Sequence, residues 1–595
     1  MPGHNRGMHG DRLKAKNAGQ ALKNFVQSIK KWLSGIIVAM VLSIGGAILA
    51  VFIPKLLGDM TNIAVNSYPE IDFNEIIPKV ILVIVLLVGS SLLNYLQGFI
   101  LAIVSARYTE KLRNQIIEKI TKLPVSYFDT HKYGDVLSTM TNDIDILATS
   151  LSQEVTDVTT NLTTLIGVLT IMFTISTELS LIAIVVVPIS VLVVGRIMNH
   201  AQKFFFDRQK MLGILDSRIE EDYAGANIIK TNSYEDVALT DFMKINEDLT
   251  TLTRKAQVYS GIAFPVTQAF TNIGYTGVCV VGGLLTIEGH INIGNLQAFI
   301  QYVSRFNRPI TEIASTMSTL QALLASSERV FDFLAEPEEE PDAEPALVLS
   351  KVKGAVEFHD VCFSYNKETP IIQNFSVKVE PGMKVAIVGP TGAGKTTIIN
   401  LLMRFYEPDS GYITVDGAPI REMKRADVRS MFGMVLQDTW LFSGNVEENL
   451  RYGKPKATHA EVVAAAKASN VNHVIEALPS TYKSEISEDS DNISAGEKQL
   501  ITIARAMVAD PPMMILDEAT SNVDTRTEQL IQDSFEKLTR SRTSFVIAHR
   551  LSTIRNSDLI LVMRDGKIVE QGDHDKLLRA GGFYAELYNS QFADS

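Results

Sequence analysis

The sequence predicts an all-helical transmembrane domain of six helices followed by a soluble α/β domain with a phosphate-binding loop. Three observations carry this prediction. The first half of the 595-residue chain repeats apolar runs long enough to cross a bilayer. The second half alternates short β-branched runs with helical patterns. Between the halves lies an acidic, proline-rich stretch, Ala335–Pro345, whose composition cannot bury a core and is typical of a linker.

The composition excludes several classes of protein. A hydrophobic content of 46% beside 21% charged residues indicates that one part of the chain is far more apolar than the rest. The net charge of −12 argues against nucleic acid as a partner, because nucleic-acid binding needs a basic surface. Only two cysteines occur, Cys279 and Cys362, and their wide separation favours neither a metal site nor a disulfide framework.

Six apolar runs are the candidate membrane helices. They are Leu33–Leu57, Ile77–Ala106, Val158–Ser176, Leu179–Ile197, Ile262–Ile287 and Ile293–Tyr302 with its continuation. Polar residues interrupt the last run, so its signal is the weakest. The alternative is a set of buried helices in a large soluble protein. Val80–Ser90, inside a longer apolar run, argues against it.

Loop charges predict the orientation. The segment before Trp32 is basic, whereas 58–75 and 288–292 contain no Lys or Arg. By the positive-inside rule both termini face the cytoplasm. The connections between helices two and three and between four and five are long and patterned as helix, so we expect the membrane helices to continue into the cytoplasm. The expected divisions are a cytoplasmic segment (1–32), the transmembrane domain (33–334), a linker (335–353) and the soluble domain (354–595).

The soluble half contains a phosphate-binding motif in its required context. A short strand, Lys384–Val388, precedes the loop, and the apolar helix pattern Ile398–Phe405 follows it. The motif GxxxxGK[ST] and its next residue are Gly389, Pro390, Thr391, Gly392, Ala393, Gly394, Lys395, Thr396 and Thr397. Loop N–H groups and the helix N-terminus suit a phosphate. We expect Lys395 to reach the β- and γ-phosphates of ATP and Thr396 to ligate Mg²⁺.

A second apolar strand, Met513–Glu518, ends in two acids. Beside a phosphate loop, Asp517 is placed to hold Mg²⁺ through water. Glu518 is placed to polarise the water that attacks the γ-phosphate, since a general base acts by position first. Two acids at a strand end are common in isolation, and the upstream loop gives them this meaning.

With these motifs together, the chain resembles a half-transporter of the ATP-binding-cassette (ABC) exporter family. The C-terminal half resembles an ABC nucleotide-binding domain over its entire length. The whole chain is most similar to subunits of bacterial heterodimeric multidrug exporters. The resemblance implies a multi-pass cell-membrane ATPase that uses ATP and Mg²⁺, contacts membrane lipid and exports a hydrophobic small molecule.

The resemblance also implies roles for individual residues. Tyr365 matches the aromatic residue that stacks on adenine, and Gln437 matches the glutamine that contacts Mg²⁺ and the attacking water. His549, after the strand Ser544–Ile547, matches the histidine that senses the γ-phosphate. Ser521–Asp524 matches the loop that couples two ATP sites across a dimer.

The signature segment departs from the family pattern LSGGQ. Here Ile493–Glu497 reads ISAGE. Ser494 and Gly496 are retained and are implied to contact ATP on the opposite subunit. Ala495 adds a methyl group and Glu497 a negative charge, so both should weaken closure on ATP. The alternative is tolerated variation. If closure is weakened, the partner is a different subunit with an intact LSGGQ, and only one of the two sites hydrolyses ATP.

Two turns resemble the coupling helices of this exporter type. The first is Pro124–Asp129 with Gly134 and Asp135, and the second, Glu221–Lys230, docks in the family into the opposite subunit. Glu488 matches the residue that helps sense that docking. Local packing is the alternative role for the aromatic residues in these turns.

The expected function is ATP-driven export of amphipathic, drug-like or lipid-like molecules by alternating access. The second interpretation is a membrane ATPase that senses or regulates a partner. An ATP-gated channel is disfavoured because the apolar runs carry few internal charges. A soluble DNA-repair ATPase fails on the membrane segments, and an importer usually keeps the two domains on separate chains.

Overall fold

A computed structural model of the chain describes residues 16–592, apart from Glu368, Asp438 and the stretches 489–492, 518–523 and 549–550. The chain forms two compact units. One, the helical unit, comprises the chain up to Thr121 together with Tyr133–Glu336. The other, the α/β unit, comprises Lys122–Lys132 together with the chain from Pro337 onward.

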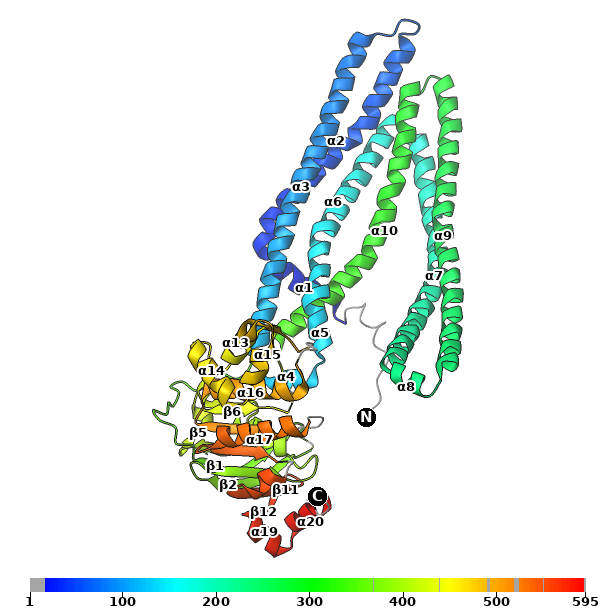
Figure 1. Cartoon of the computed structure of the whole chain (residues 1–595). Coiled ribbons are helices and arrows are strands. Elements are labelled where there is room, and N and C mark those ends of the chain that lie inside the picture. Colours follow the sequence, from blue (N-terminus) through cyan, green and yellow to red (C-terminus); the bar gives the residue numbers. More distant parts are fainter. Residues whose placement is uncertain are drawn as a thin grey trace. The chain divides into compact units, whose positions relative to one another are not determined.

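The helical unit is built from long helices joined by short turns (Figure 1). Their bounds are α1 (Ala18–Ile29), α2 (Leu33–Asn66), α3 (Phe73–Lys122), α5 (Tyr133–Ser138), α6 (Ile144–Ile175), α7 (Thr177–Ala224), α8 (Ala226–Thr231), α9 (Glu235–Ile287) and α10 (Ile293–Ala335). Each predicted apolar run lies in one of these helices or ends one residue beyond it. The helices continue past the apolar runs, as the helical patterning of the long connections predicts.

Within the described residues, five helical segments are both long and apolar enough to cross a membrane. The sixth predicted span, in α10, is long but is not among them. Arg305, Arg308 and Glu312 interrupt its apolar residues. α10 nevertheless belongs to the bundle, because it packs against α2 and α6. α7 and α9 pack side by side and are joined by α8 (Figure 1).

α2 and α10 approach each other at backbone distance. A Cβ placed on Gly58 would lie 2.2 Å from the carbonyl oxygen of Gly294. Asn62 Oδ1 accepts a hydrogen bond of 2.7 Å from the Gly294 N–H. Glycines allow this closeness because no side chain separates the two helices.

A proline inside α2 is compensated by α10. Pro54 has no N–H, so the carbonyl of Ala50 loses its helical partner. Arg305 Nη1 donates to that carbonyl at 2.8 Å. One turn earlier in α10, Tyr302 Oη donates to the carbonyl of Val51 at 2.7 Å. A neighbouring helix thus supplies the hydrogen bond that the proline removes.

The α/β unit contains two main sheets (Figure 1). The smaller has the order β2-β1-β4-β5 and is antiparallel; the larger has the order β12-β11-β3-β10-β9-β6 and is parallel except for β12. Strand bounds are β1 (Val356–Phe363), β2 (Ile372–Val379), β3 (Lys384–Val388), β4 (Ser410–Val415), β5 (Ala418–Pro419), β6 (Phe432–Val435), β9 (Met513–Asp517), β10 (Thr543–Ile547), β11 (Leu559–Arg564) and β12 (Lys567–Gly572).

Helices pack with the sheets of this unit around two hydrophobic cores. One core forms around the two sheets and the helix after β3, and a second joins β6 and β9 to a helical layer. The helices are α4 (Val125–Thr130), α11 (Lys395–Leu402), α12 (Arg425–Ser430), α13 (Val446–Arg451), α14 (His459–Ala468), α15 (Asn472–Ala477), α16 (Ala495–Ala509), α17 (Thr525–Thr539), α18 (Leu551–Arg555), α19 (His574–Ala580) and α20 (Phe583–Phe592).

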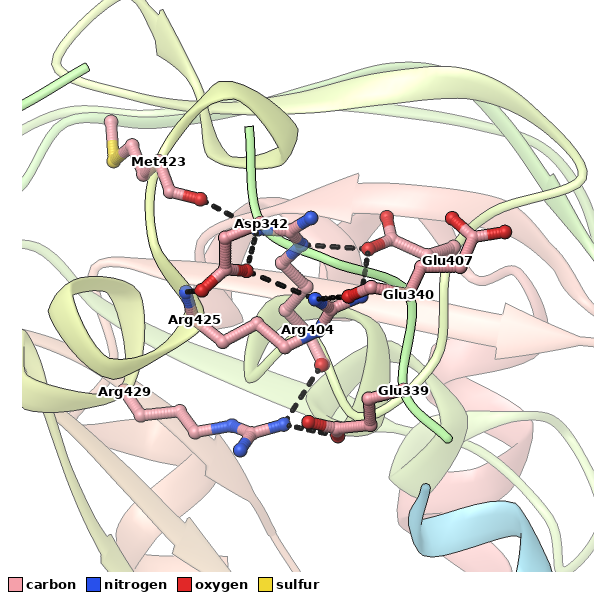
Figure 2. Close-up of polar contacts among 8 residues, drawn as sticks. All are labelled: Glu339, Glu340, Asp342, Arg404, Glu407, Met423, Arg425 and Arg429. Carbon is pink, nitrogen blue, oxygen red and sulfur yellow. Dashed lines mark hydrogen bonds and ion pairs between the residues drawn. The ribbon is translucent and has the colours of Figure 1, made fainter. Parts of the chain in front are cut away.

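The acidic linker is fastened to the α/β unit by charge. Figure 2 shows the linker cluster, whose members are Glu339, Glu340, Asp342, Arg404, Glu407, Arg425 and Arg429, together with the carbonyl of Met423. Asp342 Oδ1 lies 2.9 Å from Arg425 Nη1 and 3.5 Å from Arg404 Nη1. Arg404 and Arg425 are only 4% and 8% exposed, so their charges depend on these acids. A segment whose composition cannot form a core is therefore held by ion pairs.

Neutralising Asp342 should weaken the α/β unit. We expect Asp342→Asn to lower its stability by roughly 1–3 kcal/mol, because two buried guanidinium groups lose part of their compensating charge. Calorimetry of the full-length protein in detergent, read at the transition of this unit, measures the change. The matched control is Glu344→Gln, since Glu344 is an exposed acid of the same linker. Equal transition temperatures for the two variants would contradict a stabilising role for the linker cluster.

Candidate functional site

The larger sheet brings the predicted site residues to one edge. β6, β9, β10 and β3 are parallel neighbours, and Asp517 pairs with Ile547 while Ile547 pairs with Ile387. The carboxyl ends of parallel strands meet at the same edge, where ligands bind in such sheets. The carboxyl ends of these four strands therefore lie next to one another.

The phosphate loop begins after β3 at Gly389 and ends where α11 begins at Lys395. Gly392 and Gly394 have φ angles of +84° and +95°, which favour glycine. A Cβ on Gly394 would also lie 2.7 Å from Ile372 Cδ1. Gly394 is the N-cap of α11, and no described side chain caps this helix. Its first N–H groups are thus left for an anion, as a nucleotide phosphate requires.

Lys395 lies across this loop. Its ammonium Nζ donates to the carbonyls of Gly389, at 2.8 Å, and Pro390, at 3.1 Å. Burial lowers the pKa of Lys395, and the negative charge of Asp517 opposes that shift. The lysine is therefore a half-buried cation beside the phosphate loop and close to the predicted Mg²⁺ ligand. This donor set fits a triphosphate.

Tyr365 is tied to the same helix. Its Oη lies 3.4 Å from Thr397 Oγ1 and accepts from Asn400 Nδ2 at 3.2 Å. Tyr365 is 48% exposed, so part of its ring is free to meet a base. Thr396 is exposed in the first turn of α11, and Thr397 is buried. Of the other loop residues, Ala393 is buried, whereas Pro390 and Thr391 are exposed.

The structure places some of the predicted catalytic residues and leaves others undescribed. Asp517 is the half-buried last residue of β9, and Gln437 is exposed two residues after β6. Glu518 and His549 lie outside the described residues, as do 521–523 of the predicted coupling loop.

Asp524, the last residue of that loop, is the N-cap of α17. Its Oδ1 accepts from the N–H groups of Arg526 and Thr527, each at 3.0 Å. The Thr527 N–H holds the pKa of Asp524 below its ordinary value.

The signature segment forms a capping box at the start of α16. Ser494 Oγ accepts from the N–H of Glu497 at 3.4 Å, and Glu497 Oε2 accepts from the N–H of Ser494 at 2.8 Å. Gly496 is buried and Ala495 is exposed. This role of Glu497 was not predicted from the sequence, although the pattern Ser-x-x-Glu before an apolar run indicates it.

Glu488 joins two parts of the site region. Its Oε2 accepts from the N–H of Leu441 at 3.0 Å, in the segment after Gln437. Its Oε1 accepts from Lys498 Nζ of α16 at 3.2 Å. Glu488 thus connects the segment around Leu441 to α16, the helix that begins in the signature.

Two family profiles match the chain. The profile of the ABC transporter transmembrane region matches residues 36–310, and the profile described as ABC transporter matches residues 372–521. The two matches cover a helical membrane region and the phosphate loop with its neighbouring strands.

Curated relatives match most of the chain. A fatty acid ABC transporter ATP-binding/permease protein of Mycobacterium bovis is 46% identical over 517 residues, which are 87% of this chain and 82% of the relative. An ATP-dependent lipid A-core flippase of Desulfotalea psychrophila is 34% identical over 88% of this chain and 91% of its own length.

A solved structure of a bacterial Atm1-family ABC exporter with ATP bound matches with a TM-score of 0.72. It is 27% identical, and the match covers 95% of this chain and 98% of that one. The chain is therefore a multi-pass membrane protein of the ABC transporter family, an exporter with its membrane domain and its ATPase domain fused in one polypeptide.

Proposed function

We propose that this chain is one half of a dimeric exporter that moves an amphipathic, lipid-like molecule out of the cell. The observation that carries the proposal is the phosphate loop with its cationic Lys395, fused in one chain to long apolar helices. ATP closes two α/β units and favours the outward-open bundle, and hydrolysis resets it. A ligand drives such a change only by binding one state more tightly.

The proposal extends to the roles of individual residues in binding and hydrolysing the nucleotide. Lys395 and the loop N–H groups hold the phosphates, and Tyr365 stacks on the adenine. Thr396, Gln437 and Asp517 hold Mg²⁺, which supplies charge stabilisation at the phosphates. Glu518 orients the attacking water, and His549 contacts the γ-phosphate.

The lipid-like substrate is supported by two observations. Two relatives are named for a fatty acid and for lipid A-core. In α3, only 6% of the most apolar 18-residue stretch is buried inside the protein, so this helix offers an apolar surface to acyl chains. We place the N-terminus and the α/β unit in the cytoplasm, because the loop charges follow the positive-inside rule.

The turn at α8 supports a dimer. Tyr223, at the end of α7, and Ile228, within α8, are 86% and 70% exposed. An aromatic and an aliphatic side chain at such exposure are accessible to a partner surface. We propose that this turn docks onto the α/β unit of the other subunit.

The capping box supports an asymmetric pair of ATP sites. Glu497 places a carboxylate at the N-terminus of α16, where the family has a neutral glutamine and where ATP of the partner would bind. The carboxylate competes with phosphate for the same positive helix end. The partner is then a different subunit whose signature is intact and completes the site of Lys395 and Glu518.

Removing the Lys395 ammonium should abolish hydrolysis. We expect Lys395→Ala to reduce the ATPase rate of the purified assembly in nanodiscs by at least about 100-fold, because a preorganised charge at the phosphates is lost. Phosphate release measures the rate. Lys567→Ala, at an exposed lysine of β12, is the control and should keep wild-type activity. ATP hydrolysis that persists in the Lys395→Ala variant would mean that another protein catalyses it.

Neutralising Glu497 should strengthen ATP binding at the second site, which the signature of this chain completes. Glutamine keeps the capping box, since its amide oxygen accepts the same N–H, but removes the charge. We expect Glu497→Gln to lower the Kd for ATP at that site about fivefold in equilibrium titration of the assembly, the equivalent of roughly 1 kcal/mol from one partly screened charge. Glu461→Gln changes the matching capping box of α14 and should have no effect. An unchanged Kd for Glu497→Gln would leave ISAGE as tolerated variation.

Purification should reveal the partner. The tagged chain, extracted from its native membrane and analysed by mass spectrometry, should bring a second half-transporter with an intact LSGGQ and an altered residue in place of the Walker B glutamate. Recovery of this chain alone, as a dimer, would instead make Ile493–Glu497 a working signature in two equivalent sites.

A further inference from the structure

The segment directly after α11 contacts the first coupling turn. Tyr406 Oη donates to Asp129 Oδ2 at 2.5 Å. Asp129 lies in α4, which belongs to the same compact unit as the sheets. A second bond fixes this turn, because the N–H of Glu339 donates to the carbonyl of Lys122 at 2.9 Å. The turn is thus held to the α/β unit by a side chain and by the linker.

The ring of Tyr406 reaches the predicted adenine-binding tyrosine. The ring centroids of Tyr406 and Tyr365 are 5.0 Å apart, with planes at 88°. Phe363 completes the group, at 5.5 Å from Tyr406 and 4.9 Å from Tyr365. Edge-to-face pairs of this kind fix the orientation of each ring.

Tyr365 is therefore held from two directions. α11 holds its hydroxyl through Asn400 and Thr397, and Tyr406 holds its ring. Tyr365 as a whole remains 48% exposed. A chain of direct contacts leads from Asp129 through Tyr406 and Tyr365 to the phosphate-loop helix.

We propose that Tyr406 is a positioning residue for the nucleotide, orienting Tyr365 with its ring and linking that orientation to Asp129 with its hydroxyl. The inference rests on the proposed role of Tyr365 in binding adenine. It predicts that the placement of the 122–132 segment sets the affinity for the base, and by reciprocity that the bound base stabilises the Asp129 contact.

The hydroxyl is suited to this link at neutral pH. Burial, followed by the hydrogen bond to Asp129, raises the pKa of Tyr406, so it keeps its proton and donates. Asp129 is exposed, so the bond connects the aromatic group to the surface of the unit.

The test compares ligands with and without a base. Calorimetric titration of the full-length protein, with a chelator present to prevent hydrolysis, gives Kd for ATP and for tripolyphosphate. We expect Tyr406→Leu to weaken ATP binding roughly fivefold, because the ring contact is lost. Tripolyphosphate binding should not change, since it engages only the phosphate loop. A merely structural defect would weaken the binding of both ATP and tripolyphosphate.

The hydroxyl is tested by a double-mutant cycle. Tyr406→Phe and Asp129→Ala should each raise Kd for ATP about threefold, and the double variant should be no weaker than either, since both remove one bond. Tyr412→Phe, at an exposed tyrosine of β4, is the control. Additive effects, or an unchanged Kd in Tyr406→Leu, would overturn this inference alone. Wild-type protein that fails to bind ATP would overturn the proposed function as well.

Discussion

Parallel pairing of β3, β10, β9 and β6 is the constraint on which the site depends. Parallel strands place all their carboxyl ends at one edge, so residues more than one hundred positions apart in sequence become neighbours there. Lys395 after β3 and Asp517 at the end of β9 are close enough for the carboxylate to shift the pKa of the ammonium. These strands are buried on both faces, so packing against both layers fixes their register.

The helical unit obeys a different constraint, which is that a bilayer offers no water to unpaired backbone groups. Inside α2, Pro54 leaves the carbonyl of Ala50 without its helical hydrogen bond, and Arg305 replaces that bond by donating to the same carbonyl. The same arginine is one of the charges that make α10 too polar to resemble a simple membrane span. Its charge is therefore explained by a contact with α2, a few turns from the place where Gly58 and Gly294 let the helices touch. The weak sixth signal in the sequence reflects a helix specialised for contacts within the protein.

Local patterns explain how much of this was predictable. The phosphate loop is a contiguous strand, loop and helix, so its glycines and Lys395 could be located from spacing alone, and the long apolar helices follow from composition. The Ser494–Glu497 capping box was equally local, but the family pattern led us to interpret Glu497 only as a charge near ATP. The linker cluster and the Tyr406–Asp129 bond join residues far apart in sequence. No periodicity marks such pairs, because either partner alone resembles an ordinary surface residue.

The linker cluster and the aromatic group of Phe363, Tyr365 and Tyr406 share the short segment 404–407. The charged cluster therefore does more than stabilise the α/β unit. Arg404 and Glu407 belong to the cluster, and Tyr406 between them contacts Asp129 and Tyr365. Buried ion pairs add little net stability compared with apolar packing, but they tolerate little displacement once formed, because each charge lacks water as an alternative partner. A segment held this way moves as a whole. Both the 122–132 turn and the linker are therefore fastened to the segment that follows the phosphate-loop helix.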